Sequence, residues 1–379
     1  MVKIVGEKQF SPCGAVFTAD MPEGVEKKYD EDAASMIALL KYGCGFPFYR
    51  LENLQKNLGM PIPAATQWEI VSNTATRIEP VYQKLIEIAA QGEIIHNDDT
   101  SARILSVINA NRDNMEEGEN KKSSGKGIFT TGIISILGEL QIALFFTGRN
   151  HSGENMEELL KHRANDKSPP IQMCDALASN VSGEFETILC NCLSHGRRKF
   201  VEIIEHFPKE CLYAIETLGK VYHHDDIAKE QGMSHEKRLA FHHEKSSPLM
   251  EELKHWIDEE FDQKKIEPNS SLGKTLRYFQ NHWDALTRFL NVPGAPLDNN
   301  IVERALKKAI LHRKNSYFFK TENGAHVGDI FMTIIETCRL NQANPFDYLS
   351  SIQKHFGEFI KNISIWMPWN YQKALDSLM

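Results

Sequence analysis

Three acidic positions stand where predicted elements begin or end, which suits metal-dependent chemistry. Asp98 and Asp99 end a short apolar strand, EIIHND, and Asp175 ends another, PPIQMCDA. Glu303 lies in the first turn of a predicted helix. Carboxylates at strand ends along one sheet edge can converge in space although they are far apart in sequence. A few carboxylates hold Mg²⁺ together with water and phosphate oxygens, and two ions about 4 Å apart would clamp a phosphodiester.

Each acid also has a purely structural interpretation. The Asp98-Asp99 pair fits a turn or a helix cap, and Asp175 fits the start of a loop. The pattern Asn300-x-x-Glu303 has the spacing of a capping box, with Asn in place of Ser or Thr. Spacing alone therefore does not establish a metal site.

Basic residues gather near the same positions. Residues 195–199, HGRRK, begin a helix directly after a strand, where backbone N–H groups and arginine side chains suit phosphate contacts. Residues 298–320 carry six Lys or Arg against two acids, six minus two giving +4, within a chain of formal net charge −8. Binding of nucleic acid by total charge is therefore disfavoured, but a local basic face is compatible with it. A solvated helix face would give similar counts.

The seven cysteines are few for 379 residues, which indicates a reducing cytosol rather than a disulfide scaffold. Cys190-x-Cys192-x-x-His195 invites a zinc interpretation, but residues alternate across a strand, so the two sulfurs should point to opposite faces. Buried structural thiols are the preferred interpretation. The N-terminus lacks an apolar signal region, and Gly138-Glu139 interrupts the most apolar stretch, residues 127–146. We expect two strands joined by a tight turn there, and no membrane partner.

The elements that position these residues are those of a mixed α/β protein. Strands are predicted before, within and after residues 127–146, and residues 209–290 carry apolar residues at helical spacing. Before the first strand, a helix, a break at Gly59 and a further helix resemble a helix-turn-helix, although any helical hairpin would look the same. Residues 75–91 are predicted as another, separate helix. The expected division is 1–92, a helical N-terminal region; 93–207, the first part of the core; 208–292, a helical insertion; 293–345, the second part of the core; and 346–379, a tail.

Several motifs in order resemble the transposases of the insertion sequence 66 group, over about residues 35–371. IHNDDT is similar to that family's first acidic motif, and CNCLSHGRRKF to its Arg-Arg-Lys-Phe motif. LDNNIVERALKKAILHRKNSYFF resembles its Asn-Asn-x-x-Glu-Arg-Ala motif, and MPWNY its short C-terminal motif. The segments KYGCGFPFYRLENLQKNLGMPIPAATQWEI and IIETCRLNQANPFDYL resemble family segments before and after these. The second acidic motif departs from the family, because CDALASN stands where Asp-Gly-Tyr-x-Gly is usual.

The resemblance implies a DDE-class enzyme with a ribonuclease H-like mixed-sheet core, a large helical insertion and a helical N-terminal region. It implies that Asp98, Asp175 and Glu303 are catalytic and hold two Mg²⁺ or Mn²⁺ ions, with Asp99 the less favoured first acid. Asp98 and Asp175 would hold the ion that activates the attacking oxygen, and Asp98 and Glu303 the ion at the leaving oxygen. The function so implied is metal-dependent DNA strand cleavage and strand transfer of an insertion sequence.

The partners so implied are DNA, as transposon ends and target, and further copies of the chain on DNA. Transposon ends would be read by residues 32–72. The expected location is the bacterial cytoplasm, at the nucleoid. The alternatives are a catalytically inactive DNA-binding remnant and a helical scaffold protein without DNA. The residues expected to contact DNA are Arg197, Arg198, Lys199, Asn299, Asn300, Arg304, Lys307, Arg313 and Lys314.

Overall fold

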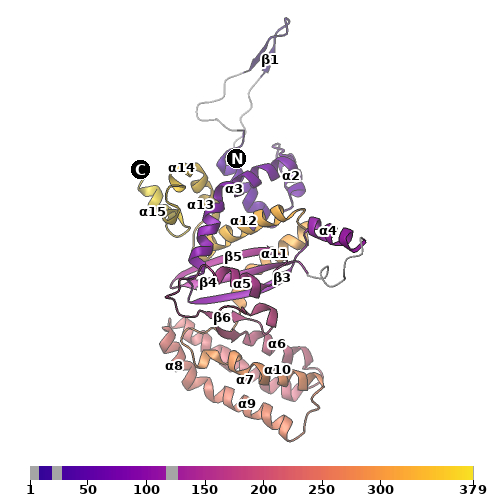
Figure 1. Cartoon of the computed structure of the whole chain (residues 1–379), viewed down its shortest axis with the longest axis vertical. Helices are drawn as coiled ribbons and strands as arrows, with labels where there is room; N and C mark the ends of the chain where they lie inside the picture. The colour runs from indigo at the N-terminus through magenta and orange to yellow at the C-terminus, as the bar shows by residue number, and fades with distance from the viewer. Residues whose placement is uncertain (1–7, 19–27, 117–126, 379) are drawn as a thin grey trace. The chain divides into compact units, whose positions relative to one another are not determined.

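The chain folds into two compact units (Figure 1). The computed structural model describes residues 8–18, 28–116 and 127–378. The first unit is built from residues 1–84, 103–113 and 308–379, and the second from residues 85–102 and 114–307. The three candidate acids all belong to the second unit.

A five-stranded mixed sheet forms the centre of the second unit. Its strand order is β5-β4-β3-β6-β7, with antiparallel pairing from β5 to β3 and parallel pairing from β3 to β7. Gly138, which has a positive φ of 57°, makes the tight turn between β4 and β5. The strands are β3 (Ile94–Ser101), β4 (Phe129–Leu137), β5 (Leu140–Gly148), β6 (Ile171–Cys174) and β7 (Ile188–Asn191).

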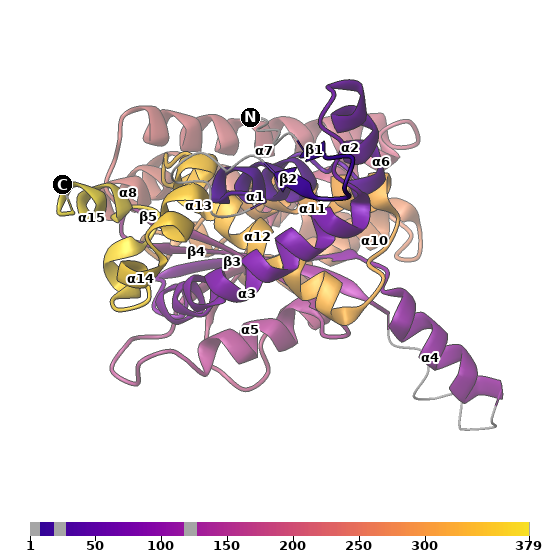
Figure 2. The same ribbon diagram turned by 90° about the horizontal axis from the view of Figure 1, so that it is seen from above.

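The alternation of side chains along β3 gives the sheet two different faces. Asn97 and Asp99 bond to the start of α5 (Ser152–Leu160), whereas His96 bonds to Asn299, just before α11 (Asn300–Ser316). Helix α5 therefore covers one face of β3, and α11 begins over the other. Figure 2 shows α5 on one side of the strands and α7 on the other.

Helices fill the chain between β7 and α11. A buried apolar core joins them to the sheet, with Phe200, Leu253 and Phe279 among its members. Gly196 permits a close approach of α6 to α10, because a Cβ there would lie 2.7 Å from Cζ of Phe279. The helices are α6 (Leu193–Ile203), α7 (Pro208–Glu230), α8 (His235–Lys245), α9 (Ser247–Asp262) and α10 (Ser271–Leu286), followed by a 3-10 turn, η3 (Arg288–Leu290).

The first unit is mostly helical. Helix α12 is buried along most of its length and contacts the π-helical turn η1, while α13 packs on α1. A two-stranded hairpin, β1 (Lys8–Phe10) with β2 (Val16–Thr18), precedes the helices. The helices and turns are α1 (Glu31–Ala38), η1 (Leu39–Gly43), α2 (Phe48–Asn57), α3 (Ala64–Ala89), α4 (Leu105–Glu116), α12 (Glu322–Leu340), α13 (Pro345–Lys354), α14 (Phe356–Phe359), η4 (Ile363–Trp366) and α15 (Tyr371–Asp376).

The structure confirms the mixed α/β class, the turn at Gly138-Glu139 and the helical character of residues 209–290. The separate helix predicted at 75–91 is wrong, because α3 runs unbroken from Ala64 to Ala89. Thr74 bonds to Gln353, and Ala75 is buried, so packing carries the helix through polar residues. Across the described residues, we find no helix with both the length and the apolar character that spanning a bilayer requires.

Candidate active site

Asp98 and Asp175 lie at the same level on neighbouring parallel strands. His96 on β3 is opposite Met173 on β6. Continuing this register by two residues places Asp98 opposite Asp175, the residue that directly follows β6. Since adjacent strands lie about 4.8 Å apart, this register places the two residues side by side where β6 ends.

Glu303 reaches the same edge because α11 packs unusually close to β4. Gly132 is opposite Asp98 in the β3–β4 pair. A Cβ on Gly132 would lie 2.8 Å from Cγ of Leu306 and 3.3 Å from Cγ2 of Val302. The absent side chain thus lets the first turns of α11 lie against the strand, and Glu303 follows Val302 in that helix.

The three acids interact electrostatically. Burial raises the pKa of Asp98 to about 7; a hydrogen bond from the Asp99 backbone opposes this, and the negative charges of Asp175 and Glu303 add to it. That backbone N–H donates to Oδ1 of Asp98 at 2.8 Å. The structure therefore places the three predicted acids in one unit, near enough for Asp175 and Glu303 to act on Asp98. Their catalytic role stays a prediction.

Asp99 has a different task. Its carboxylate accepts hydrogen bonds from Oγ1 of Thr131 at 2.6 Å and from the backbone N–H of Ser152 at 2.9 Å. It also lies 3.1 Å from Nδ1 of His151. Asp99 thus anchors the start of α5 on the other face of the sheet, which favours Asp98 as the first acid.

A buried amide network orients Asp175. The side-chain amide of Asn180 donates to Oδ1 of Asp175, and its carbonyl oxygen accepts from the Ser152 hydroxyl at 2.8 Å. Asn97 donates to the same hydroxyl at 2.9 Å and to the Asn180 backbone oxygen at 2.7 Å. The CDALASN segment, which departs from the family motif, therefore supplies its own support for the acid.

Asn299 is not available to DNA in this structure, contrary to the sequence assignment. Its side chain is fully buried; its Oδ1 lies 3.0 Å from Nδ1 of His96, and its Nδ2 donates to the Asn97 backbone at 3.0 Å. Burial lowers the pKa of His96 to about 4, so the ring is neutral near pH 7 and donates through Nδ1. Asn299 instead fixes the start of α11 against β3.

The capping-box interpretation of Asn300 and Glu303 is wrong. Helix α11 already includes Asn300, whose backbone N–H donates to Oδ1 of Asp298 at 3.1 Å. Oε1 of Glu303 is buried and has no hydrogen-bond partner in the protein. The Glu303 side chain is therefore not used to cap its helix.

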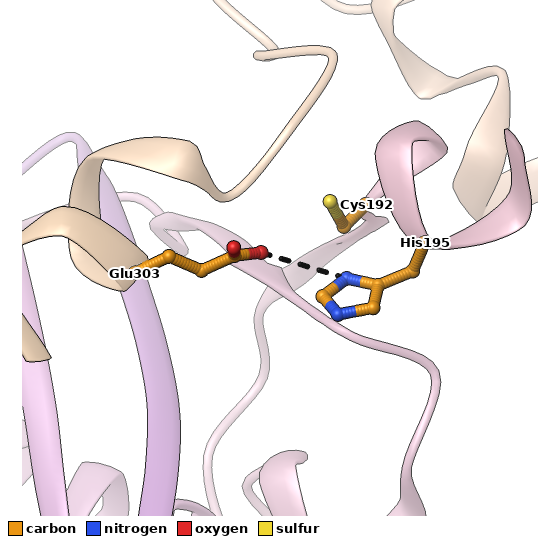
Figure 3. A group of neighbouring side chains, drawn as sticks. All are labelled: Cys192, His195 and Glu303. Atoms are coloured by element: carbon orange, nitrogen blue, oxygen red, sulfur yellow. Dashed lines mark ion pairs between the residues drawn. The ribbon is translucent and has the colours of Figure 1, made fainter. Parts of the chain in front are cut away.

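Glu303 also faces α6 (Figure 3). Its side chain and that of His195 point toward each other, with 3.8 Å between Oε1 and Nδ1, and Cys192 lies beside His195. One ligand atom from each of these three residues lies within 4.8 Å of the others, so they form a group that could hold a metal ion. Burial raises the pKa of the Cys192 thiol to about 11.

The basic residues surround these elements in the second unit. Arg198, Arg304 and Lys307 are exposed, Arg197 and Asn300 are half-buried, and Lys199 lies over the Tyr278 ring at 4.5 Å. Because α6 begins at Leu193, the arginines lie one turn inside the helix rather than at its free N–H groups. In the first unit, Arg313 is half-buried and Lys314 exposed near the end of α11.

Sequence reasoning missed the supporting residues. Nothing in the spacing of Asn97, Ser152 and Asn180 shows that they meet, since their contacts are long-range. The pair Cys192 and His195 was visible as a motif fragment, but its third member, Glu303, is 108 residues beyond His195 (303 minus 195). The sequence signal that could have pointed to Glu303 is its position in the first turn of the predicted helix that became α11.

Known proteins were compared with the chain. Three uncharacterized proteins of Sinorhizobium fredii are similar to it: y4jD is 25% identical over 357 residues, y4qI 24% over 365 and y4hP 23% over 363. The matches cover 89%, 90% and 88% of this chain but only 65%, 62% and 61% of those proteins, so the chain spans just under two thirds of their length. The sequence profile described as "Transposase IS66 family" matches residues 27–327. The chain therefore belongs to the IS66 transposase family.

Proposed function

We propose that the chain is a DDE-type DNA transposase that cleaves and transfers DNA strands with Asp98, Asp175 and Glu303 as its metal-binding acids. The observation that carries the proposal is the placement of the three acids in one unit, on β3, at the end of β6 and at the start of α11, where burial and then the charges of Asp175 and Glu303 raise the pKa of Asp98. Membership of a transposase family supports the reaction class. The five-stranded mixed sheet supports the ribonuclease H-like core that the family resemblance implies.

The donor set fits Mg²⁺ or Mn²⁺. Hard divalent cations prefer carboxylate oxygens, and a partly buried carboxylate with two acidic neighbours gains from a cation that offsets their repulsion. Asp98, on the central strand, is the residue that two ions would share with Asp175 and Glu303. When bound, the ions would supply activation of the attacking oxygen and stabilisation of charge on the phosphate.

The remaining residues position this cluster and the DNA. Asn180 and Asn299 fix the segments that carry Asp175 and Glu303, so the acids need little rearrangement before reaction. Exposed Arg198, Arg304 and Lys307 would contact phosphates, and these contacts should weaken as salt rises. In the first unit, α2, the turn at Gly59 and the start of α3 form the helical hairpin proposed to read transposon ends.

We extend the proposal to the assembly. Strand transfer joins two DNA ends to a target, so we expect several copies of the chain on DNA, at the bacterial nucleoid. Size measurement of the chain with and without a duplex carrying the element's ends tests this point. A cleavage-competent complex that contains only one copy of the chain would contradict it.

The decisive experiment compares cleavage with binding. The full chain is incubated with a duplex carrying the ends of its own element, with Mg²⁺, Mn²⁺ or EDTA. Wild type should nick the duplex only with metal, while Asp98→Asn and Glu303→Gln should lose cleavage by at least about 100-fold and retain salt-dependent binding. Cleavage undiminished in both variants would overturn the site.

Two other outcomes separate the alternatives. Salt-dependent binding without cleavage in any metal would favour an inactive DNA-binding remnant. Absence of any salt-dependent DNA retention would favour a helical scaffold protein.

A further inference from the structure

Two buried polar atoms at the edge of the site face each other but do not form a hydrogen bond. Nδ1 of His195 and Oε1 of Glu303 are both shielded from solvent, and neither has a hydrogen-bond partner in the protein. They lie 3.8 Å apart, which is longer than a hydrogen bond. Because a buried polar group without a partner is costly, this geometry requires a third group that serves both.

The neighbouring sulfur narrows the chemistry of that group. Sγ of Cys192 lies within 4.8 Å of the His195 and Glu303 ligand atoms (Figure 3). It accepts a hydrogen bond from the Asn299 backbone N–H at 3.3 Å, which holds the sulfur in place at the start of α6. A site with one sulfur, one imidazole nitrogen and one carboxylate oxygen suits Zn²⁺ or Co²⁺ rather than Mg²⁺.

The spacing agrees with such an ion. Zinc bonds of 2.0–2.3 Å in a tetrahedral arrangement separate neighbouring ligand atoms by about 3.3–3.8 Å. The 3.8 Å between the His195 and Glu303 atoms meets this range, and the sulfur needs a shift of about 1 Å or less. Cys192 caps the start of α6 and His195 lies in its first turn, so side-chain movements of Cys192 and Glu303 are sufficient to close the site.

We propose that Cys192, His195 and Glu303 form a binding site for a divalent cation of the zinc class, and that this site shares Glu303 with the three-acid cluster that would hold Mg²⁺. Binding releases the thiol proton of Cys192 to solvent and leaves the fourth ligand position to water. Since Glu303 then belongs to the zinc site, it is withdrawn from Asp98 and Asp175. The site is thereby a zinc-sensitive inhibitory switch, a consequence that rests on the proposed function.

Metal binding is tested first, without DNA. The reduced full chain is titrated with Co²⁺, and the ultraviolet thiolate-to-cobalt band is recorded. We expect one Co²⁺ per chain with this band, displaced by one equivalent of Zn²⁺. Cys192→Ser should lose the thiolate-to-cobalt band. Glu303→Gln should keep the band but bind Co²⁺ at least tenfold more weakly. Cys190→Ser, which changes the other buried cysteine of the same segment, is the matched control and should retain the band.

The results separate clearly. A wild-type chain without a thiolate band, or a band that Cys192→Ser retains, would overturn the site. If Cys192→Ser does not fold, as shown by circular dichroism, Glu303→Gln and His195→Ala decide, and unchanged Co²⁺ affinity in both would overturn it.

Inhibition is tested second. Cleavage with Mg²⁺ is measured as Zn²⁺ is added, and each variant is compared with its own zinc-free rate. The Zn²⁺ concentration for half inhibition should rise at least tenfold in Cys192→Ser. If the chain binds Co²⁺ but never cleaves DNA, the metal site stands and the proposed function fails. If it cleaves DNA but shows no cobalt band, the metal site alone fails.

Discussion

Two aspartates of the second unit, the buried Asp225 and the half-buried Asp98, lie in opposite electrostatic surroundings. Asp225 on α7 is 1% exposed, and its carboxylate contacts Arg238 at 2.7 Å, Lys229 at 2.6 Å and Nε2 of His242 at 3.2 Å. Burial raises its pKa, but the His242 hydrogen bond and the two cations outweigh burial, so the pKa lies well below its ordinary value. Asp98 has acids for neighbours, and its pKa is raised to about 7.

The difference distinguishes a structural charge from a functional one. The helical insertion neutralises its buried carboxylate entirely with its own side chains, so that charge stabilises the fold. Near the sheet edge, Asp98 instead has acids for neighbours, its Oδ1 accepts only a backbone N–H, and neighbouring Asp175 accepts from the neutral amide of Asn180. A protein keeps such uncompensated charge at sites where a ligand completes the balance.

The largest expected effect comes from removing the charge of Asp225, which we call the matched site because cations surround it. Asp225→Asn leaves Arg238 and Lys229 without their acceptor in a buried place, and should lower the free energy of unfolding by about 3–5 kcal/mol. Urea unfolding followed by circular dichroism measures this. The neighbouring exposed Asp226 gives the control, and Asp226→Asn should change stability by no more than about 0.5 kcal/mol. Equal losses in both variants would show that Asp225 is not a matched structural charge.

A second change moves Glu303 relative to Asp98 and Asp175 without removing a charge. Gly132→Ala places a methyl group 2.8 Å from Cγ of Leu306, so α11 must shift. We expect a loss of about 1–3 kcal/mol in the free energy of unfolding, with reduced DNA cleavage, because Glu303 moves with the helix. Gly219 of α7 is the control, since a Cβ there meets no atom within 4 Å. Full cleavage by Gly132→Ala would mean that close packing of α11 does not position Glu303.

The sequence was sufficient for the parts of this comparison that depend on local pattern. The strand that leads to Asp175, the turn at Gly138 and the helices of the insertion all follow from periodicity and turn residues. The strand predicted to end at Asp98-Asp99 is longer than expected, because pairing with β4 carries β3 on to Ser101. The family resemblance supplied Glu303 as the third acid.

The rest depends on contacts that no local pattern records. Asn299, taken for a DNA contact, is buried, because the His96 side chain and the Asn97 backbone on another strand hold it. The residues that pair with Asp225 come from two helices, α7 and α8. The close approach of α11 to β4 depends on one glycine, Gly132. Such features are set by packing between distant segments, which composition and spacing do not encode.

A third effect is smaller and has the opposite sign to the first. Asp98→Asn removes a charge that the fold disfavours, so in EDTA at pH 8 it should raise the free energy of unfolding by about 1–2 kcal/mol, because each unit of raised pKa corresponds to about 1.4 kcal/mol before solvent screening. Added Mg²⁺ should then stabilise wild type more than the variant. A destabilised Asp98→Asn in EDTA would contradict the unmatched-charge interpretation. Asp99→Asn, which loses the anchor of α5, should be destabilising under the same conditions.

The smallest expected effect is a pH dependence of the matched site. The folded pKa of Asp225 lies below its unfolded value, so its contribution is complete above about pH 4 and is lost as pH falls toward the folded pKa. The stability difference between wild type and Asp225→Asn should therefore shrink by about 1 kcal/mol between pH 5 and pH 3. Both proteins retain Asp98, so its titration cancels in this difference. Urea unfolding at the two pH values measures the change, and a difference that grows toward acid would mean that the Asp225 carboxylate, like that of Asp98, is opposed rather than stabilised by its surroundings.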